Sequence, residues 1–467
     1  MATSDQPLFS FSTGTARIGR SASMGIKLLV LTLLTLIMSL FALWISSMVD
    51  ERTERQAQVA KDIAAGVGGA QLLLGPTVLI PYTVPSSDPK IAASNSVFLV
   101  SATDAKATVK TRTEERRRSL FRVPVFNADA DMHGTFDLSH VASELPPSAA
   151  IHWKDAEIVI GISDVRGAKS DAIVRSGDKQ WRLQPSRIWS RLTLDSDKSV
   201  GLFGTTLNGT ITATTPLDVS ATMTLSGAQR IAVLAYGRST RLTQLGDWRS
   251  PGFDGSFPPV TREISQRGFR ATWNVPFIAR GVSAEDDVQK INGLAGTAMG
   301  VSLIEVADPY QSVTRALKFA PLFLALVFLS YFVFEATTGH RVHVAQYVLV
   351  GVAQLIFYLL LLSFAEHIGF TGGFAIGGGA TVLLLSANAG WIFASRVQAL
   401  RALGIFGPLY TMIFLLLRLE DNALLVGAIF SFAAVSAAMY VTRSMDWFGR
   451  TARPEFPGNP TMRVGEL

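Results

Sequence analysis

The chain has 467 residues, a formal net charge of +6 and no cysteine, so disulfides, thiolate metal sites and a cysteine nucleophile are excluded. Hydrophobic residues make up 48% of the chain and charged residues only 17%, a balance that indicates lipid-buried segments. The basic residues are dispersed along the chain, which argues against nucleic acid as a partner.

The first long apolar run covers residues 24–48 and follows an amino-terminal tail, residues 1–23. About 20 apolar residues are enough to cross the hydrocarbon core of a bilayer as a helix. A cleaved signal peptide is the competing interpretation, but its apolar region would hold only about 7–15 residues. Because this run is longer and charged residues follow it directly, we interpret it as an uncleaved transmembrane anchor. Residues 51–66 have a helical composition, and we expect them to continue the same helix out of the membrane.

Residues 49–316 have the character of a large β-rich domain. Runs rich in Val, Ile, Thr and aromatic residues are separated by Gly, Pro, Asn and Asp, a pattern typical of strands and turns. These runs are residues 76–84, 95–102, 107–113, 119–138, 156–165, 221–236 and 269–277. They predict one large domain, for which two stacked sheets are one arrangement, and a division into two domains stays open.

Residues 250–273 combine turn-forming residues with four aromatic side chains, Phe253, Phe257, Phe269 and Trp273. These rings are a candidate partner-binding surface. The alternative, which we favour, is a long ordered loop leading into a strand, with the aromatic side chains filling the core.

The last third of the chain contains five further apolar runs, residues 317–334, 344–365, 374–394, 400–417 and 423–441. The linkers between them are short, which predicts antiparallel packing of neighbours. With the first run they predict six transmembrane helices, one before the β-rich domain and five in a bundle over residues 317–441. The predicted fold is therefore a helical membrane bundle plus a large β-rich domain, α+β overall, with a tail at residues 442–467.

The distribution of basic residues predicts the orientation, because cytoplasmic loops and tails collect Lys and Arg. With the amino terminus in the cytoplasm, the short loops on the other side hold only Arg418. Arg315 and Lys318 point the other way, but they flank a long translocated domain. We therefore expect both termini in the cytoplasm and the β-rich domain across the membrane, which in a bacterium is the periplasm. The cytoplasmic set comprises Arg17, Arg20, Lys27, Arg341, Arg396, Arg401, Arg443, Arg450 and Arg453.

Charged residues close two of the apolar runs on the face predicted to be outside. They form a candidate polar cluster of Glu366, His367, Arg418, Glu420 and Asp421. Charged residues within hydrocarbon are costly and usually functional, but these fall at helix ends, where they meet water. We therefore favour interface markers over a site that gathers ions or protons, and we interpret Glu335, at the inner end of its run, in the same way.

Gly369, Gly373 and Gly377 recur at every fourth position where the fourth predicted span begins. On a helix they form a stripe of small residues that allows close backbone approach. A broken helix of the kind that transporters use at a binding site is the alternative. We favour helix packing.

The chain contains no HExxH, GxSxG or P-loop motif. Residues 64–71 fail the GxGxxG pattern because Gln71 stands in place of the third glycine. The histidines match no standard metal-ligand spacing. We therefore predict no catalytic, cofactor-binding or metal-binding residue and no enzymatic activity.

Several strings in one order carry a family resemblance. They are LLGPTVLIPY (residues 73–82), ISDVRG (162–167), FDGSFPPVTREISQRGFRATW (253–273), DPYQSVTRALKFAPLFLALVFLSYFVFE (308–335), RVHVAQYVLVGVAQLIFYLLLLSFAEHIGF (341–370), and LEDNALLVGAIFSF with TRSMDW between residues 419 and 447. In these strings the chain resembles the CreD family of bacterial inner-membrane proteins, described as cell-envelope integrity proteins. The resemblance runs from the first span to about residue 447. It implies an envelope protein whose level is set by a two-component system and which is linked to tolerance of envelope-directed agents such as β-lactams. It brings no catalytic residues.

Three functions are compatible with these observations. The leading hypothesis is a non-enzymatic membrane protein that displays its β-rich domain to an envelope protein or to peptidoglycan. The second is a transporter or channel built from the carboxy-terminal bundle. The third is a membrane-embedded enzyme acting on lipid-linked envelope material, with Glu366 and His367 as an acid–base pair. Adjacent residues on a helix point about 100° apart, which disfavours such a pair. The oligomeric state stays open.

Overall fold

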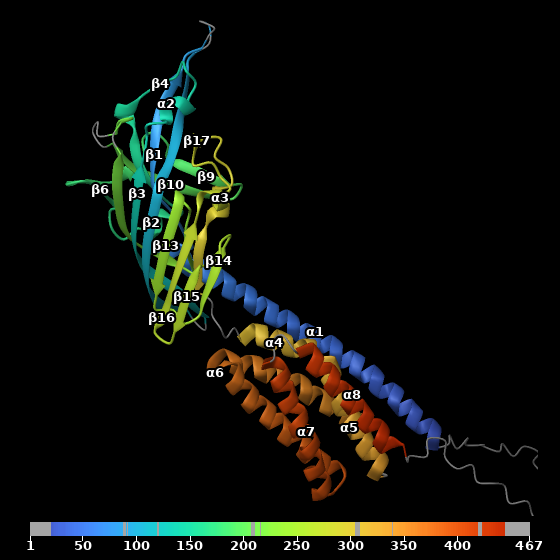
Figure 1. The fold of residues 1–467 in the computed structure, drawn as a ribbon. Coiled ribbons are helices and arrows are strands. Elements are labelled where there is room, and N and C mark those ends of the chain that lie inside the picture. Colours follow the sequence, from blue (N-terminus) through green and yellow to red (C-terminus); the bar gives the residue numbers. More distant parts are fainter. Residues whose placement is uncertain are drawn as a thin grey trace, which may run out of the picture. The chain divides into compact units, whose positions relative to one another are not determined.

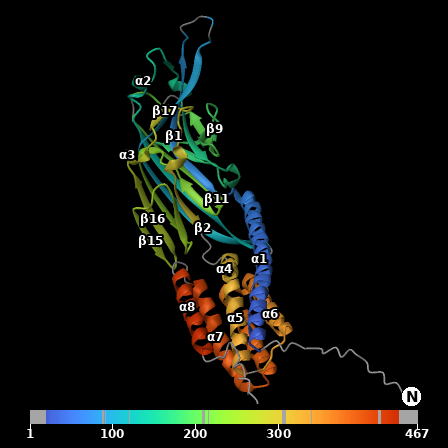
Figure 2. The same cartoon turned by 90° about the vertical axis from the view of Figure 1, so that its right-hand side faces the viewer.

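The computed structural model describes residues 20–443 apart from residues 87–89, 91, 119–120, 207–210, 215, 304–308, 339 and 419–422. It divides into two compact units (Figures 1 and 2). We call Met1–Arg52 with Ala307–Leu467 the helical unit, and Thr53–Val306 the strand unit. The prediction of apolar helices together with a large β-rich domain is confirmed.

A single helix, α1 (Arg20–Val67), runs through the first apolar segment and the polar segment after it. The predicted continuation over residues 51–66 is therefore confirmed. The helix ends at two glycines with left-handed backbone, Gly68 (φ 99°) and Gly69 (φ 59°). The Gly69 amide donates a hydrogen bond to the Ala64 carbonyl over 2.8 Å, as in a glycine-terminated helix.

The strand unit contains two sheets, each predominantly antiparallel. Each strand of sheet A is hydrogen-bonded to at least one other strand of that sheet, and the pairing of β1 with β12 is parallel. Its strands are β1 (Gln71–Val84), β4 (Ala150–Ile151), β5 (Glu157–Ile162), β8 (Gln184–Pro185), β9 (Arg191–Asp195), β10 (Lys198–Thr206), β12 (Arg230–Val233), β14 (Pro251–Gly255), β17 (Glu285–Asp287) and β18 (Met299–Leu303).

Sheet B has the order β7–β6–β11–β3–β2–β13–β16–β15, and its β2–β13 pairing is parallel. The strand β2 links the two sheets, because residues 94–101 pair with β1 in sheet A and residues 104–118 pair with β3 in sheet B. Two of the predicted strand segments, residues 95–102 and 107–113, are thus one strand. The strands of sheet B are β2 (Ser94–Arg118), β3 (Phe121–Phe136), β6 (Ile173–Ser176), β7 (Lys179–Arg182), β11 (Leu217–Ala228), β13 (Gly237–Gly246), β15 (Thr261–Ser265) and β16 (Gly268–Val275).

The two sheets share one hydrophobic core. Alternating residues of β2, β3 and β11 are buried, and β1 and β5 are buried at almost every position. The largest fully buried side chains of this core include Tyr236 and Trp273. Short helical turns cover the edges: α2 (Val141–Glu144), α3 (Phe277–Arg280), η1 (Trp153–Asp155), η2 (Val165–Gly167) and η3 (Leu294–Thr297).

The helical unit contains α4 (Pro309–Lys318), α5 (Ala320–Thr338), α6 (Val344–Ile392), α7 (Arg396–Arg418) and α8 (Ala423–Thr442) besides the first part of α1. Among the described residues, α1, α5, α6 and α7 are long and apolar enough to cross a membrane, whereas the apolar part of α8, Leu425–Ala437, is shorter. Large apolar side chains such as Leu29, Trp391 and Phe432 are more than two-thirds exposed on this unit. Lipid contact explains their exposure.

The helix α6 consists of two halves. Gly369 has non-helical backbone angles (φ 79°, ψ 163°) and separates residues 344–368 from residues 370–392. Gly373 of the second half approaches the backbone of Ala365 in the first, and Gly377 approaches Leu360 and Leu361. The two halves therefore fold back against each other.

Candidate functional site

The corner of α6, residues 366–372, gathers side chains from three other helices. The Glu366 side chain is only 9% exposed. Its Oε1 accepts a hydrogen bond from the Tyr310 hydroxyl of α4 over 2.9 Å and lies 3.9 Å from the Arg52 guanidinium of α1. The carboxylate is therefore held by two helices, and such contacts fit a structural role at a helix end.

The other members of the predicted polar cluster have different neighbours. His367 is exposed, and its Nδ1 lies 2.9 Å from the carbonyl oxygen of Ser363 in the same helix. Arg418 donates from Nη2 to Thr371 Oγ1 over 2.6 Å, and its guanidinium carbon lies 5.4 Å from the Phe414 ring centroid. In the described part of the chain, Arg418 thus bonds to this corner but not to Glu366.

Glu420 and Asp421, which the sequence places in the same cluster, lie outside the described residues. The structure therefore brings Glu366 and Arg418 to one corner through separate partners.

The three predicted packing glycines have two different roles. A Cβ on Gly373 would lie 2.8 Å from the Ala365 nitrogen, and one on Gly377 would lie 3.6–3.8 Å from atoms of the first half of α6. Gly369 is exposed, and a Cβ on it would meet nothing within 4 Å, but its positive φ allows the chain to turn at the corner. The first two glycines allow close helix packing, and the third allows the reversal.

An ion pair that the sequence analysis missed lies in the same unit. Lys27 of α1 binds the Glu335 carboxylate of α5, whose side chain is only 9% exposed. The Tyr347 hydroxyl of α6 donates to Glu335 Oε2 over 2.9 Å, and Lys27 Nζ donates to the Val342 carbonyl over 3.4 Å. In the sequence, a single base lies at the start of the first apolar run and a single acid directly after the second. Only the folded chain shows that they pair.

Buried hydrogen bonds also lie inside the helical unit. The Tyr410 hydroxyl donates to Gln354 Oε1 over 3.0 Å, and Gln354 is 1% exposed. The Asn388 amide donates to the Tyr331 hydroxyl over 3.2 Å, and Tyr331 donates to a backbone carbonyl of α6. Among the described residues, Gln354 Nε2 is buried without a hydrogen-bond partner.

The aromatic residues of residues 250–273 belong largely to the core. Trp273 is fully buried and donates from Nε1 to the Phe257 carbonyl over 3.0 Å, and Phe269 is 6% exposed. Phe253 packs edge-on against both rings, at centroid distances of 6.1 Å and 6.0 Å. The partner-surface interpretation is therefore corrected for Phe269 and Trp273, while Phe253 and Phe257 are half-buried.

The prediction of a long loop leading into the strand at residues 269–277 is also wrong, because residues 251–255 and 261–265 form the strands β14 and β15.

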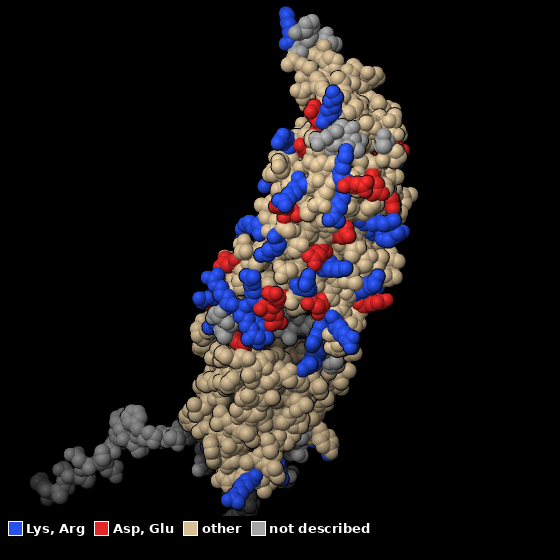
Figure 3. Space-filling view, turned by 90° about the vertical axis from the view of Figure 1, so that its left-hand side faces the viewer, with Lys and Arg blue, Asp and Glu red and all other residues tan. Residues whose placement is uncertain are grey.

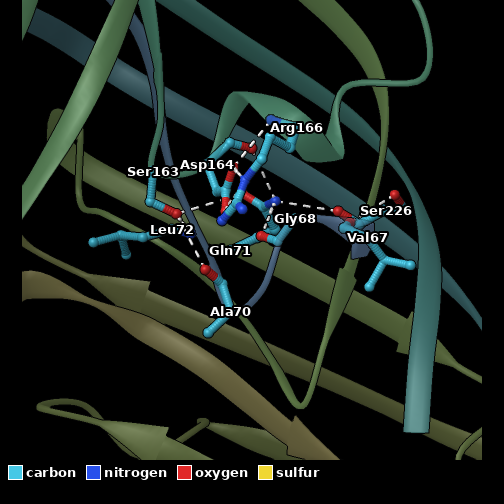
Figure 4. Close-up of polar contacts among 9 residues, drawn as sticks. All are labelled: Val67, Gly68, Ala70, Gln71, Leu72, Ser163, Asp164, Arg166 and Ser226. Carbon is cyan, nitrogen blue, oxygen red and sulfur yellow. Dashed lines mark hydrogen bonds and ion pairs between the residues drawn. The ribbon is translucent and has the colours of Figure 1, made fainter. Parts of the chain in front are cut away.

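Gln71 is the centre of a buried hydrogen-bond cluster at the start of the strand unit (Figure 4). Its Nε2 lies 2.7 Å from the carbonyl oxygen of Gly68 and 3.1 Å from those of Asp164 and Ser226, and its two hydrogens are shared among the three acceptors. Gln71 is completely buried. The side chain that breaks the nucleotide-binding motif thus joins the end of α1 to β11 and to the turn after β5.

That turn is fixed by its own ion pair. Asp164 accepts from the Arg166 side chain over 2.6 Å and from the Arg166 amide over 3.0 Å. The hydrogen bonds and charge of Arg166 hold the pKa of Asp164 below its usual value. The string ISDVRG is therefore the end of a strand and a 3-10 turn that cover Gln71.

A second buried polar group lies between α3 and sheet A. Arg280 is 5% exposed and donates to Ser101 Oγ over 2.9 Å, and burial lowers the pKa of its guanidinium to about 10. Nearby Glu285 accepts from Arg238 over 2.9 Å and also binds His140. Glu285 is thus paired within the strand unit, whereas Nε and Nη1 of Arg280 are buried without a hydrogen-bond partner among the described residues.

The exposed face of sheet B carries an open polar groove of about 540 Å3. Cross-strand pairs place Lys110 opposite Asp129 and Thr108 opposite Asp131, with Thr224 on the far side of Asp129. Lysine, arginine and acidic side chains are interspersed over the strand unit in Figure 3, whereas the visible surface of the helical unit is almost free of them. Within the described residues, no group of three or more His, Asp or Glu side chains is placed to hold a metal ion.

Comparisons with known proteins find matches over most of the chain. The sequence model of a family described as inner membrane protein CreD matches residues 23–448. A protein of Escherichia coli (strain K12), also described as inner membrane protein CreD, is 29% identical over 419 residues, which are 86% of this chain and 89% of the relative. The resemblance found in the sequence is therefore confirmed.

Proposed function

The chain belongs to the CreD family of inner membrane proteins, and from that premise we propose that it supports the integrity of a bacterial envelope by binding an envelope component with its strand unit. In this proposal the protein is not an enzyme. It raises tolerance of envelope-directed agents by what it binds, either an envelope protein or peptidoglycan, and its level follows a two-component system.

The proposed topology has six membrane crossings: α1, α5, both halves of α6, α7 and α8. Both termini are cytoplasmic and the strand unit is periplasmic. Lys27 and Arg52 support the first crossing, because 25 residues at about 1.5 Å per residue separate the two cations by about 38 Å along α1. That distance exceeds the ~30 Å hydrocarbon core, so each cation reaches an interface region.

The observation that carries the proposed function is the contrast between the two units. The carboxylates Glu335 and Glu366 of the helical unit are each held by a cation and a tyrosine of other helices. The strand unit, in contrast, presents open polar clefts, such as the groove around Asp129 and Asp131. We infer that the helices fasten the protein in the membrane and that the strand unit carries the recognition.

A replacement of the strand unit tests this proposal. A variant that keeps all the apolar helices but exchanges β1 to β18 for an inert soluble domain should fail to restore envelope tolerance to a strain that lacks the protein. Immunoblots of the membrane fraction must show equal amounts of variant and unchanged protein. Full restoration by the variant would overturn the proposal.

Transport through the helical unit is the second candidate. The observation that favours it is the buried amide of Gln354, whose Nε2 has no partner among the described residues. If a polar solute or ion passes this point, Gln354→Leu should abolish envelope tolerance while the protein stays folded in the membrane. Unchanged tolerance in this variant would mean that the Gln354 amide has no role in transport.

A further inference from the structure

A second cleft of the strand unit lies where β1, β2 and β4 meet, and its volume is about 430 Å3. Its floor is one face of paired strands, on which Thr83 of β1 opposes Asn95 of β2. The turn η1 contributes Asp155, and the segment between β8 and β9 contributes Ile188 and Trp189. The volume falls within the ~300–1,000 Å3 range of small-molecule sites.

The polar groups of the floor are fixed by one another. The Thr83 hydroxyl donates to Asn95 Oδ1 over 2.8 Å and lies 2.8 Å from His152 Nε2. Because a hydroxyl has a single hydrogen, this arrangement makes His152 Nε2 the donor to Thr83. The Asn95 side-chain oxygen is occupied by Thr83, and its exposed N–H groups have no hydrogen-bond partner among the described residues.

The wall that carries Trp189 is positioned by buried hydrogen bonds. Glu157 is 4% exposed and accepts from Ser186 Oγ over 2.6 Å. The Trp189 amide donates to the same Ser186 oxygen over 3.1 Å. The indole therefore reaches the cleft from an ordered segment, which lowers the entropic cost of binding.

The geometry points to a carbohydrate site in this cleft. A sugar ring has an apolar face of C–H groups and a rim of hydroxyls that both donate and accept. The indole of Trp189 and the side chain of Ile188 suit the apolar face, while the Asn95 amide, the Asp155 carboxylate and His152 suit the hydroxyls. This inference rests on the proposed function, because it names the ligand class that the strand unit binds.

Two other ligand classes fit the cleft less well. Its lining residues include no Lys or Arg but do include the carboxylate of Asp155, which disfavours an anionic group. Tyr82 and Thr83 of β1 pair with β2 on one side and with β4 on the other. An extended peptide therefore has no free edge of β1 to which it could add as a strand.

Oligosaccharide titration tests the inference. Full-length protein in a detergent without a sugar headgroup is titrated calorimetrically with oligomers of β-linked N-acetylglucosamine and, separately, of β-linked glucose. We expect saturable binding of at least one series, weakened about tenfold or more by Trp189→Ala and by Asn95→Ala. Binding of only the acetylated series would indicate an amino-sugar polymer, and binding of both would indicate a site for the sugar ring itself.

The controls separate a local effect from misfolding. Trp189→Phe keeps an aromatic face and should retain most of the affinity, and Thr261→Ala, at an exposed position of β15 outside both clefts, should leave it unchanged. Circular dichroism must show the same thermal unfolding for each variant as for the unchanged protein. The inference is overturned if neither series binds, or if Trp189→Ala and Asn95→Ala bind as tightly as the unchanged protein.

The same variants distinguish this inference from the proposed function. If the strand-unit replacement loses envelope tolerance but Trp189→Ala and Asn95→Ala keep it and bind no less sugar, the carbohydrate site fails and the proposed function stands. If the replacement keeps tolerance, the proposed function fails whatever the titration shows.

Discussion

Gly373 lies so close to Ala365 that a Cβ on the glycine would be 2.8 Å from the alanine nitrogen and 3.2 Å from its Cα. The contact joins the two halves of α6 across the corner at Gly369. Because the neighbouring atoms belong to the backbone, a side chain at position 373 can be accommodated only by moving one half of the helix.

We therefore expect Gly373→Ala to destabilise the helical unit by about 1–3 kcal/mol, as overpacking does. Gly379→Ala is the matched control on the same helix, since its Cβ would meet nothing within 4 Å. The control should be neutral or stabilising by up to about 1 kcal/mol, because alanine favours helix over glycine. Thermal unfolding in detergent measures both, and equal melting temperatures would contradict the packing role.

The ion pair of Lys27 and Glu335 predicts a non-additive pair of substitutions. Lys27→Met leaves a buried carboxylate without its cation and should cost about 3 kcal/mol. Removing both charges, with Glu335→Leu added, should cost clearly less than the sum of the single effects. Arg55→Met, at an exposed position of α1, serves as the control. Additive effects in unfolding experiments would show that the two side chains are energetically independent.

Because the amide of Gln71 is buried and hydrogen-bonded, its replacement by an apolar side chain of similar size should lower the stability of the strand unit strongly. In Gln71→Leu, the carbonyls of Gly68, Asp164 and Ser226 lose their shared donor. The Asp164 carbonyl keeps the Gly167 amide as a donor over 3.2 Å, but the loss of the buried donor to the other two should destabilise the strand unit by about 3 kcal/mol. Gln180→Leu, in an exposed position of β7, should change stability little. Chemical unfolding followed by tryptophan fluorescence compares the two, and similar midpoints would refute a central role of Gln71.

The pKa of Asp164 predicts a loss of stability in acid. Its folded-state value is lowered, first by hydrogen bonds from Arg166, so its contribution is present above the ordinary value of 3.8 and is lost as the pH falls below it. Unfolding midpoints between pH 6 and pH 3 should therefore fall less steeply in Asp164→Asn. Arg166→Met should flatten the same part of the profile, since it removes the donor. A profile that neither variant changes would exclude this pair as a source.

The contacts of Glu366 predict that its replacement has little effect, whereas replacement of a catalytic or transporting acid would abolish function. Glu366→Gln keeps an acceptor for the Tyr310 hydroxyl and loses only the long ion pair with the half-exposed Arg52. We expect a loss of at most about 1 kcal/mol in stability and unchanged envelope tolerance. Loss of tolerance at normal protein levels would instead support a pathway for ions or protons at this corner.

The coarse fold follows from the sequence because hydropathy and strand-like alternation depend on neighbouring residues. These local patterns therefore predict one long helix over residues 24–66 and strands around β1, β3 and β5. The close packing at Gly373 and Gly377 also follows from their local spacing.

The rest depends on contacts between distant residues. Gln71 fails a local motif, and only the approach of Ser226 and Asp164 shows what it does. For Trp273 and Phe269 the sequence favours a place in the core over an exposed aromatic surface, and the pairing of β16 with β13 decides for the core. Asn95 reaches the cleft through the pairing of β2 with β1, and Trp189 reaches it from the segment between β8 and β9, two strands that pair with β10. No spacing in the sequence reveals that these segments meet.

Lys27 and Glu335 are 308 positions apart, so the lysine is synthesised well before the acid to which it binds. At about 5–20 residues per second, a ribosome needs about 15–60 s to reach the acid after it has made the lysine. In the proposed topology, α1 is during that interval a lone anchor in the bilayer, while the strand unit is still being synthesised. A chain that terminates before the last third would therefore keep its tether to the membrane but never close its helical unit.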